Sequence, residues 1–254
     1  MKKYLAIVGL SVVSVLACIA NPGVQAQHDA LAEATGYSGE DLKDVRRELV
    51  EVLPFDKEAA SRMDISVQKA KALPTAELIR AFVKSGTWVT ILLYDDTNLG
   101  VYRLSQASPS LSELLSRKDF ATGILKAYST FNVDPKSSPE FTKENGVMTL
   151  KILEYLMAYR PVFSGFKGRE KEILRAMCRQ YWAMKRVNKG YAEKDRPYPE
   201  CPIWASFGYV LEQQMGLSLP AGMRIDPVTK SVYTAKPMPA NLDEIVKHFE
   251  AISS

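Results

Sequence analysis

The hydrophobic positions of this chain are densest between Val147 and Tyr159. On a helix, at 100° per residue, the apolar side chains of this segment point in nearly every direction, and Lys151 and Glu154 leave only a narrow polar strip. A helix that is apolar nearly all round must be surrounded by other elements, so we expect the central helix of a globular core. A membrane span is disfavoured, because 13 residues with two charges are too few for a bilayer that needs about 20.

Shorter helical patterns precede this segment. An apolar stripe follows Ser38, a typical N-cap residue, and continues to Pro54. The pattern predicts a second helix over residues 56–73 and a third over residues 76–84, closed by Gly86. Ser108-Pro109 then predicts the start of further helices that run to Phe131, followed by a loop at residues 134–138. The entry to the central helix is either Ser138-Pro139 or Asn145-Gly146.

Residues 87–104 interrupt the helical pattern. Residues 88–94 are β-branched and aromatic, residues 95–98 have turn composition, and residues 100–104 return to a strand pattern, which together predict a β-hairpin. Asp95 and Asp96 at its tip are interpreted as turn formers, because a calcium loop needs more oxygen ligands. A second hairpin, formed by residues 223–225 and 231–234, is the weaker prediction.

After the central helix, Arg160-Pro161 predicts its end and residues 163–168 form a turn. Residues 169–187 then have the clearest amphipathic pattern of the chain, with apolar side chains on one face and Lys or Arg on the other. Two more helices are predicted over residues 203–215 and, after the cap Asn241, over residues 242–252. The fold class is therefore mainly α, a multi-helix globular domain with one small β-hairpin, or two.

The first 26 residues have the layout of a secretory signal peptide. Lys2 and Lys3 form a basic n-region, residues 4–20 are apolar, and Val24-Gln25-Ala26 has small residues where a signal peptidase cleaves. A lipoprotein signal, after which Cys18 would be the lipidated first residue, is a less favoured alternative. We therefore predict a periplasmic or secreted protein whose mature part, residues 27–254, is a single domain. A subdivision near residues 105–110 is the alternative to a single domain.

Cleavage would leave two cysteines, Cys178 and Cys201. In an oxidising compartment this number suggests one disulfide, and two separate buried thiols are the alternative. The cysteines have neither redox nor zinc-ligand spacing, so we predict no metal and no cofactor.

Signals of catalysis are sparse. The two histidines, His28 and His248, lie in no nucleophile, base or metal motif, and the chain has no phosphate-binding or dinucleotide-binding fingerprint. Glu154 is the single candidate catalytic acid. A carboxyl group on an apolar helix has either a partner or a raised pKa, and acids with a raised pKa cleave glycosides. The alternative is a structural Lys151–Glu154 pair.

Charge is distributed unevenly along the chain. Residues 160–196 hold 11 Lys or Arg and 4 Asp or Glu, a net charge of +7, whereas the whole chain carries +4. Such a region attracts polyanions such as lipopolysaccharide, anionic lipid, acidic glycan or nucleic acid. The candidate binding residues are Lys171, Arg175, Arg179, Trp182 and Arg186. The competing interpretation is that these charges form the solvated face of an amphipathic helix.

These patterns favour an exported, non-catalytic binding or envelope-associated protein that uses the basic helix against an anionic envelope component or a protein partner. No specific nucleic-acid motif is present, and no transmembrane helix is expected in the mature chain. Two alternatives are a helical enzyme that cleaves cell-wall glycan with Glu154 as general acid, and a structural subunit of an envelope complex with an exposed apolar patch.

Overall fold

A computed structural model describes residues 62–93, 97–134, 143–196, 223–225, 232–234 and 242–254, together with Ala32. The chain divides into two compact units, Met1–Pro54 and Phe55–Ser254. Apart from Ala32, the described residues belong to the second unit. The predicted signal peptide, the predicted helices over residues 38–53 and 203–215, and Cys201 lie outside the described residues.

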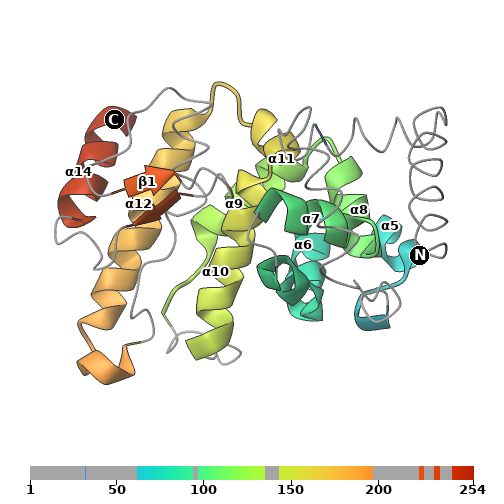
Figure 1. Cartoon of the computed structure of the whole chain (residues 1–254), viewed down its shortest axis with the longest axis horizontal. Helices are drawn as coiled ribbons and strands as arrows, with labels where there is room; N and C mark the ends of the chain where they lie inside the picture. Colours follow the sequence, from blue (N-terminus) through green and yellow to red (C-terminus); the bar gives the residue numbers. More distant parts are fainter. Residues whose placement is uncertain are drawn as a thin grey trace, which may run out of the picture. The chain divides into compact units, whose positions relative to one another are not determined.

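The described part of the chain is mainly helical, as predicted (Figure 1). Its elements in chain order are α5 (Val67–Ala72), α6 (Thr75–Ser85), the 3₁₀ helix η1 (Thr87–Leu93), α7 (Thr97–Ser105), α8 (Pro109–Ser116), α9 (Phe120–Thr130), α10 (Lys143–Ala158), α11 (Arg160–Ser164), α12 (Glu170–Asn188), the 3₁₀ helix η2 (Glu193–Asp195), β1 (Met223–Ile225), β2 (Val232–Thr234) and α14 (Leu242–Ser253).

Local sequence signals explain several of these boundaries. Gly86 ends α6 in the left-handed conformation, with φ of 74°, which costs glycine little because it has no Cβ. Ser108 caps α8 by accepting a hydrogen bond from the backbone N–H of Leu111, at 3.2 Å. Pro109 follows in the first turn of α8, where its missing N–H costs nothing. The predicted end of α6 at Gly86 and the predicted start of α8 at Ser108-Pro109 are confirmed.

The predicted hairpin over residues 87–104 is wrong, because this stretch forms η1 and α7. Several of its apolar residues are buried, with Ile91 1% exposed and Val101 and Leu104 fully buried, whereas Val89 of η1 is 50% exposed. β-propensity is a weak preference that packing overrides. Gly100 contributes to that packing: it is buried, and a Cβ built on it would lie 2.8 Å from the backbone oxygen of Ile91.

The helix predicted over residues 56–73 is interrupted at Asp64, and α5 begins only at Val67. The carboxylate of Asp64 accepts hydrogen bonds from the hydroxyls of Ser108 and Ser110 and, at 3.0 Å, from the backbone N–H of Ser110. An aspartate whose side chain accepts hydrogen bonds from hydroxyl and backbone N–H groups tends to interrupt a helix instead of continuing it. Asp64 thus attaches the segment before α5 to the start of α8.

The end of the central helix also differs from the prediction. α10 ends at Ala158, and Arg160-Pro161 begins the short helix α11. Proline is tolerated in the first turn of a helix, so Pro161 starts a new helix there. The backbone N–H of Arg160 donates to the side-chain oxygen of Asn98 on α7, at 3.0 Å. This bond fixes the corner between α10 and α11.

The prediction that the segment 147–159 forms a helix enclosed by other elements is confirmed for residues 150–158. α10 contacts α7, α9 and α11, and Leu150, Ile152, Leu153, Leu156 and Met157 are at most 2% exposed. Each such side chain contributes about 1.5–3 kcal/mol to stability by leaving water. α10 is therefore held by apolar packing along most of its length.

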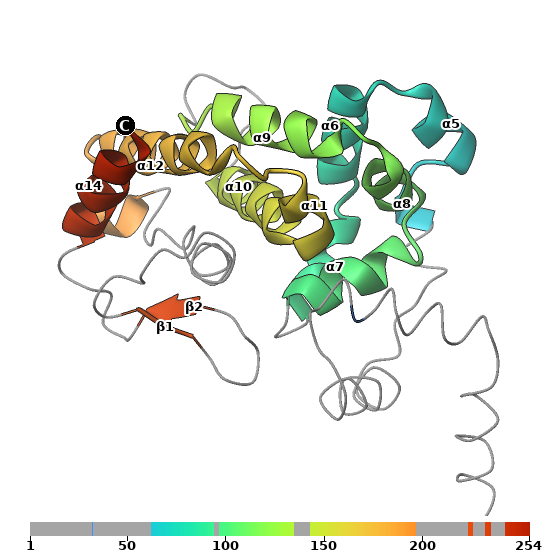
Figure 2. The ribbon, with the colours of Figure 1, turned by 90° about the horizontal axis from the view of Figure 1, so that it is seen from above.

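α12 and α14 lie side by side in both ribbon views (Figures 1 and 2). α12 also packs on α9, where the side-chain amide of Gln180 donates to the backbone oxygens of Tyr128, at 2.6 Å, and Phe131, at 3.0 Å. These carbonyls stand at the end of α9, and that of Tyr128 also accepts the backbone N–H of the C-cap residue Phe131 at 3.3 Å. Gln180 therefore caps α9 and positions α12 against it.

β1 and β2 pair antiparallel, with Met223 opposite Thr234 and Ile225 opposite Val232. They lie where the sequence predicts the second hairpin. Among the described residues, no helix combines the length and the apolar character that crossing a bilayer requires.

We predict that Gly100→Ala destabilises the protein by about 1–3 kcal/mol, because the new methyl group collides with the backbone of η1. Without this collision, alanine inside a helix would stabilise by up to about 1 kcal/mol. Urea unfolding followed by circular dichroism measures the difference. Gly190→Ala is the control, since its Cβ would lie at an ordinary 3.4 Å from the nearest atom. A stabilised Gly100→Ala variant would contradict the close packing of α7 on η1.

Candidate functional site

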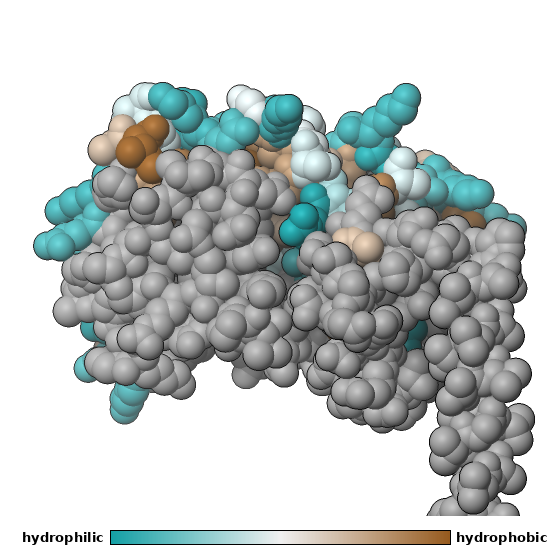
Figure 3. Space-filling view, turned by 45° about the horizontal axis from the view of Figure 1, so that its top comes forward, coloured by the Kyte–Doolittle hydropathy of each residue, from teal (hydrophilic) through white to brown (hydrophobic). Residues whose placement is uncertain are grey.

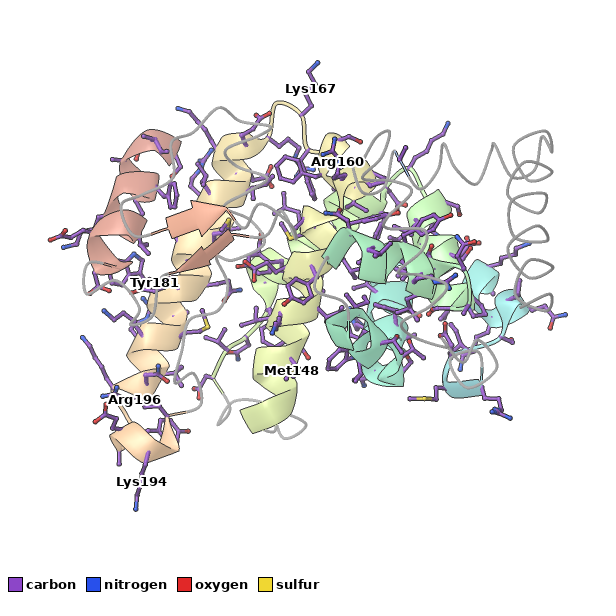
Figure 4. All side chains as sticks on the ribbon, viewed as in Figure 1. Met148, Arg160, Lys167, Tyr181, Lys194 and Arg196 are labelled. Atoms are coloured by element: carbon purple, nitrogen blue, oxygen red, sulfur yellow. The ribbon has the colours of Figure 1, made fainter. Side chains whose placement is uncertain are left out.

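The two faces of α12 differ as the amphipathic pattern predicts. Ile173, Leu174, Met177, Tyr181 and Met184 are at most 2% exposed. On the opposite face the cationic side chains of Lys171, Arg175, Arg179, Arg186 and Lys189 are exposed. Figure 4 shows Lys167 and Lys194 beyond the two ends of this helix. The candidate site is therefore the solvent face of α12.

One edge of this face is neutralised by α14. Lys185 forms a salt bridge with Asp243, and the hydroxyl of Tyr181 donates to the same carboxylate at 2.5 Å. Tyr181 lies on the side of α12 that faces α14 (Figure 4). The hydrogen bonds from Lys185 and Tyr181 hold the pKa of Asp243 below its ordinary value. Both side chains of the ion pair are about two-fifths exposed, so it contributes at most about 1 kcal/mol.

Two of the predicted binding residues are also engaged by the C-terminal segment. The indole N–H of Trp182 donates to Glu250 at 2.8 Å, and the ammonium of Lys171 donates to the backbone oxygen of Ser254 at 2.9 Å. The Tyr181 and Trp182 rings meet edge to face, with centroids 5.1 Å apart. Trp182 therefore keeps a fixed orientation and stays partly exposed.

Three predicted binding residues, Arg175, Arg179 and Arg186, remain open to solvent; we call them the arginine stripe. Within the described residues, no carboxylate lies within ion-pair distance of these three guanidinium groups. Arg175 donates to the backbone oxygen of Lys171 at 3.2 Å. Arg175 also lowers the pKa of Glu172 through space, but the carboxylate of Glu172 is paired with Arg169 at 2.9 Å.

The stripe is straight because of its spacing along the helix. Steps of four and seven residues return to nearly the same side of an α-helix. Arg175 and Arg186 are 11 residues apart, which corresponds to about 16 Å at a rise of about 1.5 Å per residue. Along the helix, Trp182 lies between Arg179 and Arg186, on the side of the stripe that faces α14. The arrangement presents a line of fixed positive charge with one aromatic ring beside it.

Glu154, the candidate catalytic acid, is 1% exposed within α10. Burial raises the pKa of its carboxyl group well above 4.5, and Lys151 lowers it by a smaller amount. In the described part of the chain, its Oε1 atom has no hydrogen-bond partner. Lys151 lies with its ammonium 5.5 Å from the centre of the Tyr155 ring. A carboxyl group so deeply buried is out of reach of a polymeric glycan, and its position fits a neutral core group.

The structure does not support the predicted disulfide between Cys178 and Cys201. Cys178 is a free thiol, 2% exposed, and it donates to the backbone oxygen of Val246 at 3.7 Å. It lies inside the α12–α14 contact. Burial raises the pKa of the thiol to about 12, so it stays protonated and unreactive at neutral pH.

The turn before α12 and the two histidines add no further site among the described residues. In the turn before α12, the backbone N–H of Gly168 donates a hydrogen bond to the carboxylate of Glu170 at 2.8 Å. This bond lowers the pKa of Glu170. His28 lies outside the described residues, and so does the side chain of His248. Across the described segments, His, Cys, Asp and Glu side chains form no group of three that could hold a metal ion.

Sequence reasoning missed the role of Asp243 and Glu250. They are seven residues apart on the last helix, and this spacing places them on one side of it. That spacing showed an acidic edge on this helix, but it did not show that the edge faces α12. The pairing depends on the packing of Val246 and Phe249, which are buried on α14.

We predict that the stability of the protein falls with rising pH because of Glu154. Its pKa is raised in the folded state, so the folded protein holds this proton more tightly than the unfolded chain. Below about pH 4, the proton on Glu154 makes its full contribution to the free energy of unfolding. Above that pH, this contribution falls by on the order of 1.4 kcal/mol per pH unit until the pKa of Glu154 in the folded state is reached. Glu154→Gln should remove this dependence, as measured by urea unfolding between pH 4 and pH 8.

Glu172→Gln is the control for this experiment. The pKa of exposed Glu172 is lowered by Arg169, so its small contribution is present above about pH 4.5 and is lost on acidification. An unchanged pH dependence in Glu154→Gln would show that Glu154 is not the group responsible.

The chain was also compared with known proteins. No protein-family model matches it, and no curated protein or solved structure is significantly similar to it.

Proposed function

We propose that this protein is an exported, non-catalytic binding protein that holds an anionic partner on the arginine stripe of α12. The observation that carries the proposal is the contrast between two sets of cations on one helix. Lys171 and Lys185 are engaged by the C-terminal segment, whereas Arg175, Arg179 and Arg186 extend into solvent without a described carboxylate partner. Export is proposed from the signal-like residues 1–26.

The charge of the stripe supports binding for a physical reason. Three cations in a line reinforce one another, so their combined potential attracts a polyanion more strongly than scattered charges do. Guanidinium groups also form paired hydrogen bonds with carboxylate, sulfate or phosphate groups. Residues 160–196 extend the same positive field, with a net charge of +7. The stripe therefore favours an anionic partner over a neutral one.

Two other functions receive less support. A glycan-cleaving enzyme with Glu154 as its acid requires a carboxyl group that substrate can reach, and Glu154 is buried. A structural subunit requires an extended apolar patch. In the view of Figure 3, the described residues are largely hydrophilic, with small hydrophobic areas between them. The most exposed large apolar residues are Met63, Val67 and Val89, all between 50% and 57% exposed.

We predict that the triple variant Arg175→Gln, Arg179→Gln, Arg186→Gln binds an anionic matrix at least about tenfold more weakly than the unaltered protein. Glutamine keeps helix propensity nearly unchanged, so α12 should persist. The measurement is the salt concentration that elutes the full-length protein from sulfated agarose, with circular dichroism to check folding.

The matched control removes three exposed cations from other elements, with the changes Arg80→Gln, Lys118→Gln and Lys126→Gln. Both variants lose the same net charge. Only the stripe variant should elute at a clearly lower salt concentration. If the two variants elute together, retention reflects net charge alone and the proposed function is refuted.

A further inference from the structure

The arginine stripe is narrow, and this limits the shape of its ligand. On one side it is bordered by α14, which carries Asp243 and Glu250. On the other side, near the start of α12, stands Glu172. Asp243 is paired with Lys185 and Glu172 with Arg169, so the positive charge available to an anion is confined to the stripe, and a flat anionic surface would contact little of it. A single extended chain can follow the three arginines and avoid these acids.

The stripe is also poor in apolar side chains. The other exposed positions of α12 are occupied by Lys171 and Glu172, and exposed Lys189 follows the helix as its C-cap. The large apolar residues with the greatest exposure belong to η1, to α5 and to the segment before α5. Stable protein interfaces have an apolar centre that is depleted in charge. The stripe lacks such a centre, so a protein partner fits it less well than a hydrated polyanion.

Trp182 adds a stacking surface to this line of charge. The indole is partly exposed, and its N–H is fixed by Glu250 at 2.8 Å. The Lys185 ammonium lies 5.6 Å from the centre of the ring, within the range of a cation–π contact. Proteins that bind single-stranded nucleic acid generally stack successive bases on several aromatic side chains. Within the described length of α12, the exposed face has one aromatic ring, which suits one sugar of a chain recognised mainly by charge.

We propose that the arginine stripe binds a single chain of an acidic polysaccharide. Its carboxylate or sulfate groups pair with Arg175, Arg179 and Arg186, and one sugar ring stacks on Trp182. The inference rests on the proposed function and specifies the ligand class of the same surface. The guanidinium groups supply the hydrogen bonds to the acidic groups, and Trp182 supplies an apolar face to the C–H side of the ring.

The test is a titration of the full-length protein with four probes of matched charge. The probes are an oligogalacturonate of about 12 residues, oligo(dT), poly-glutamate, and vesicles that contain anionic phospholipid. We expect the oligogalacturonate to bind at least about fivefold more tightly than each of the other three. Calorimetry gives the affinity. A control titration repeats the measurement with Arg80→Gln, Lys118→Gln, Lys126→Gln, which should bind as the unaltered protein does.

Variants at Trp182 test the stacking contact separately. Trp182→Leu should weaken oligogalacturonate binding about fivefold, whereas Trp182→Phe, which keeps an aromatic face, should weaken it less. Thermal unfolding checks that both variants remain folded. Equal loss in the two variants, with folding intact, would overturn the stacking part of the proposal.

The two proposals fail in different ways. Tighter binding of oligo(dT), poly-glutamate or vesicles overturns the polysaccharide inference and leaves an anionic partner in place. Unchanged binding of all four probes by the Arg175→Gln, Arg179→Gln, Arg186→Gln variant overturns the proposed function as well. Loss of oligogalacturonate binding in that variant, together with the expected order of probes, supports both.

Discussion

The packing of α14 on α12 is the contact on which the proposed surface depends. Buried Val246 and Phe249 hold α14 in place, and Asp243 and Glu250 then meet Lys185 and Trp182 of α12. This contact neutralises one edge of the basic helix and leaves the other edge charged. Because the apolar contact contributes far more free energy than the exposed ion pair, burial of apolar surface decides which cations face solvent.

α12 is itself held from its other side. Gln180 satisfies two carbonyl groups at the end of α9, and α9 packs in turn on α10. The buried face of α12 is thus part of the same helical core that encloses Glu154. A rigid support of this kind favours recognition by charge, since the arginines project from a fixed helix and lose little backbone freedom on binding.

Glu154 illustrates how a core can include an ionisable group without using it for catalysis. Its apolar surroundings raise the pKa of the carboxyl group, which favours the neutral form and lowers the cost of burying a charge. Cys178 follows the same rule, because burial keeps its thiol protonated. In a sequence, a glutamate on an apolar helix and a cysteine are both candidates for a chemical role. In this fold, their burial makes a structural role the simpler interpretation.

The sequence by itself determined the mainly helical class, the buried α10, the amphipathic α12 and the caps at Gly86 and Ser108, because periodicity and capping are local properties. Tertiary structure decided the rest. Residues 87–93 and 97–104 became helical because η1 and α7 bury Ile91, Val101 and Leu104 against neighbours, and packing overrides a weak β-preference. Tertiary structure also decided which cations of α12 are paired and which are exposed to solvent, because Lys185 and Asp243 are 58 residues apart in the chain.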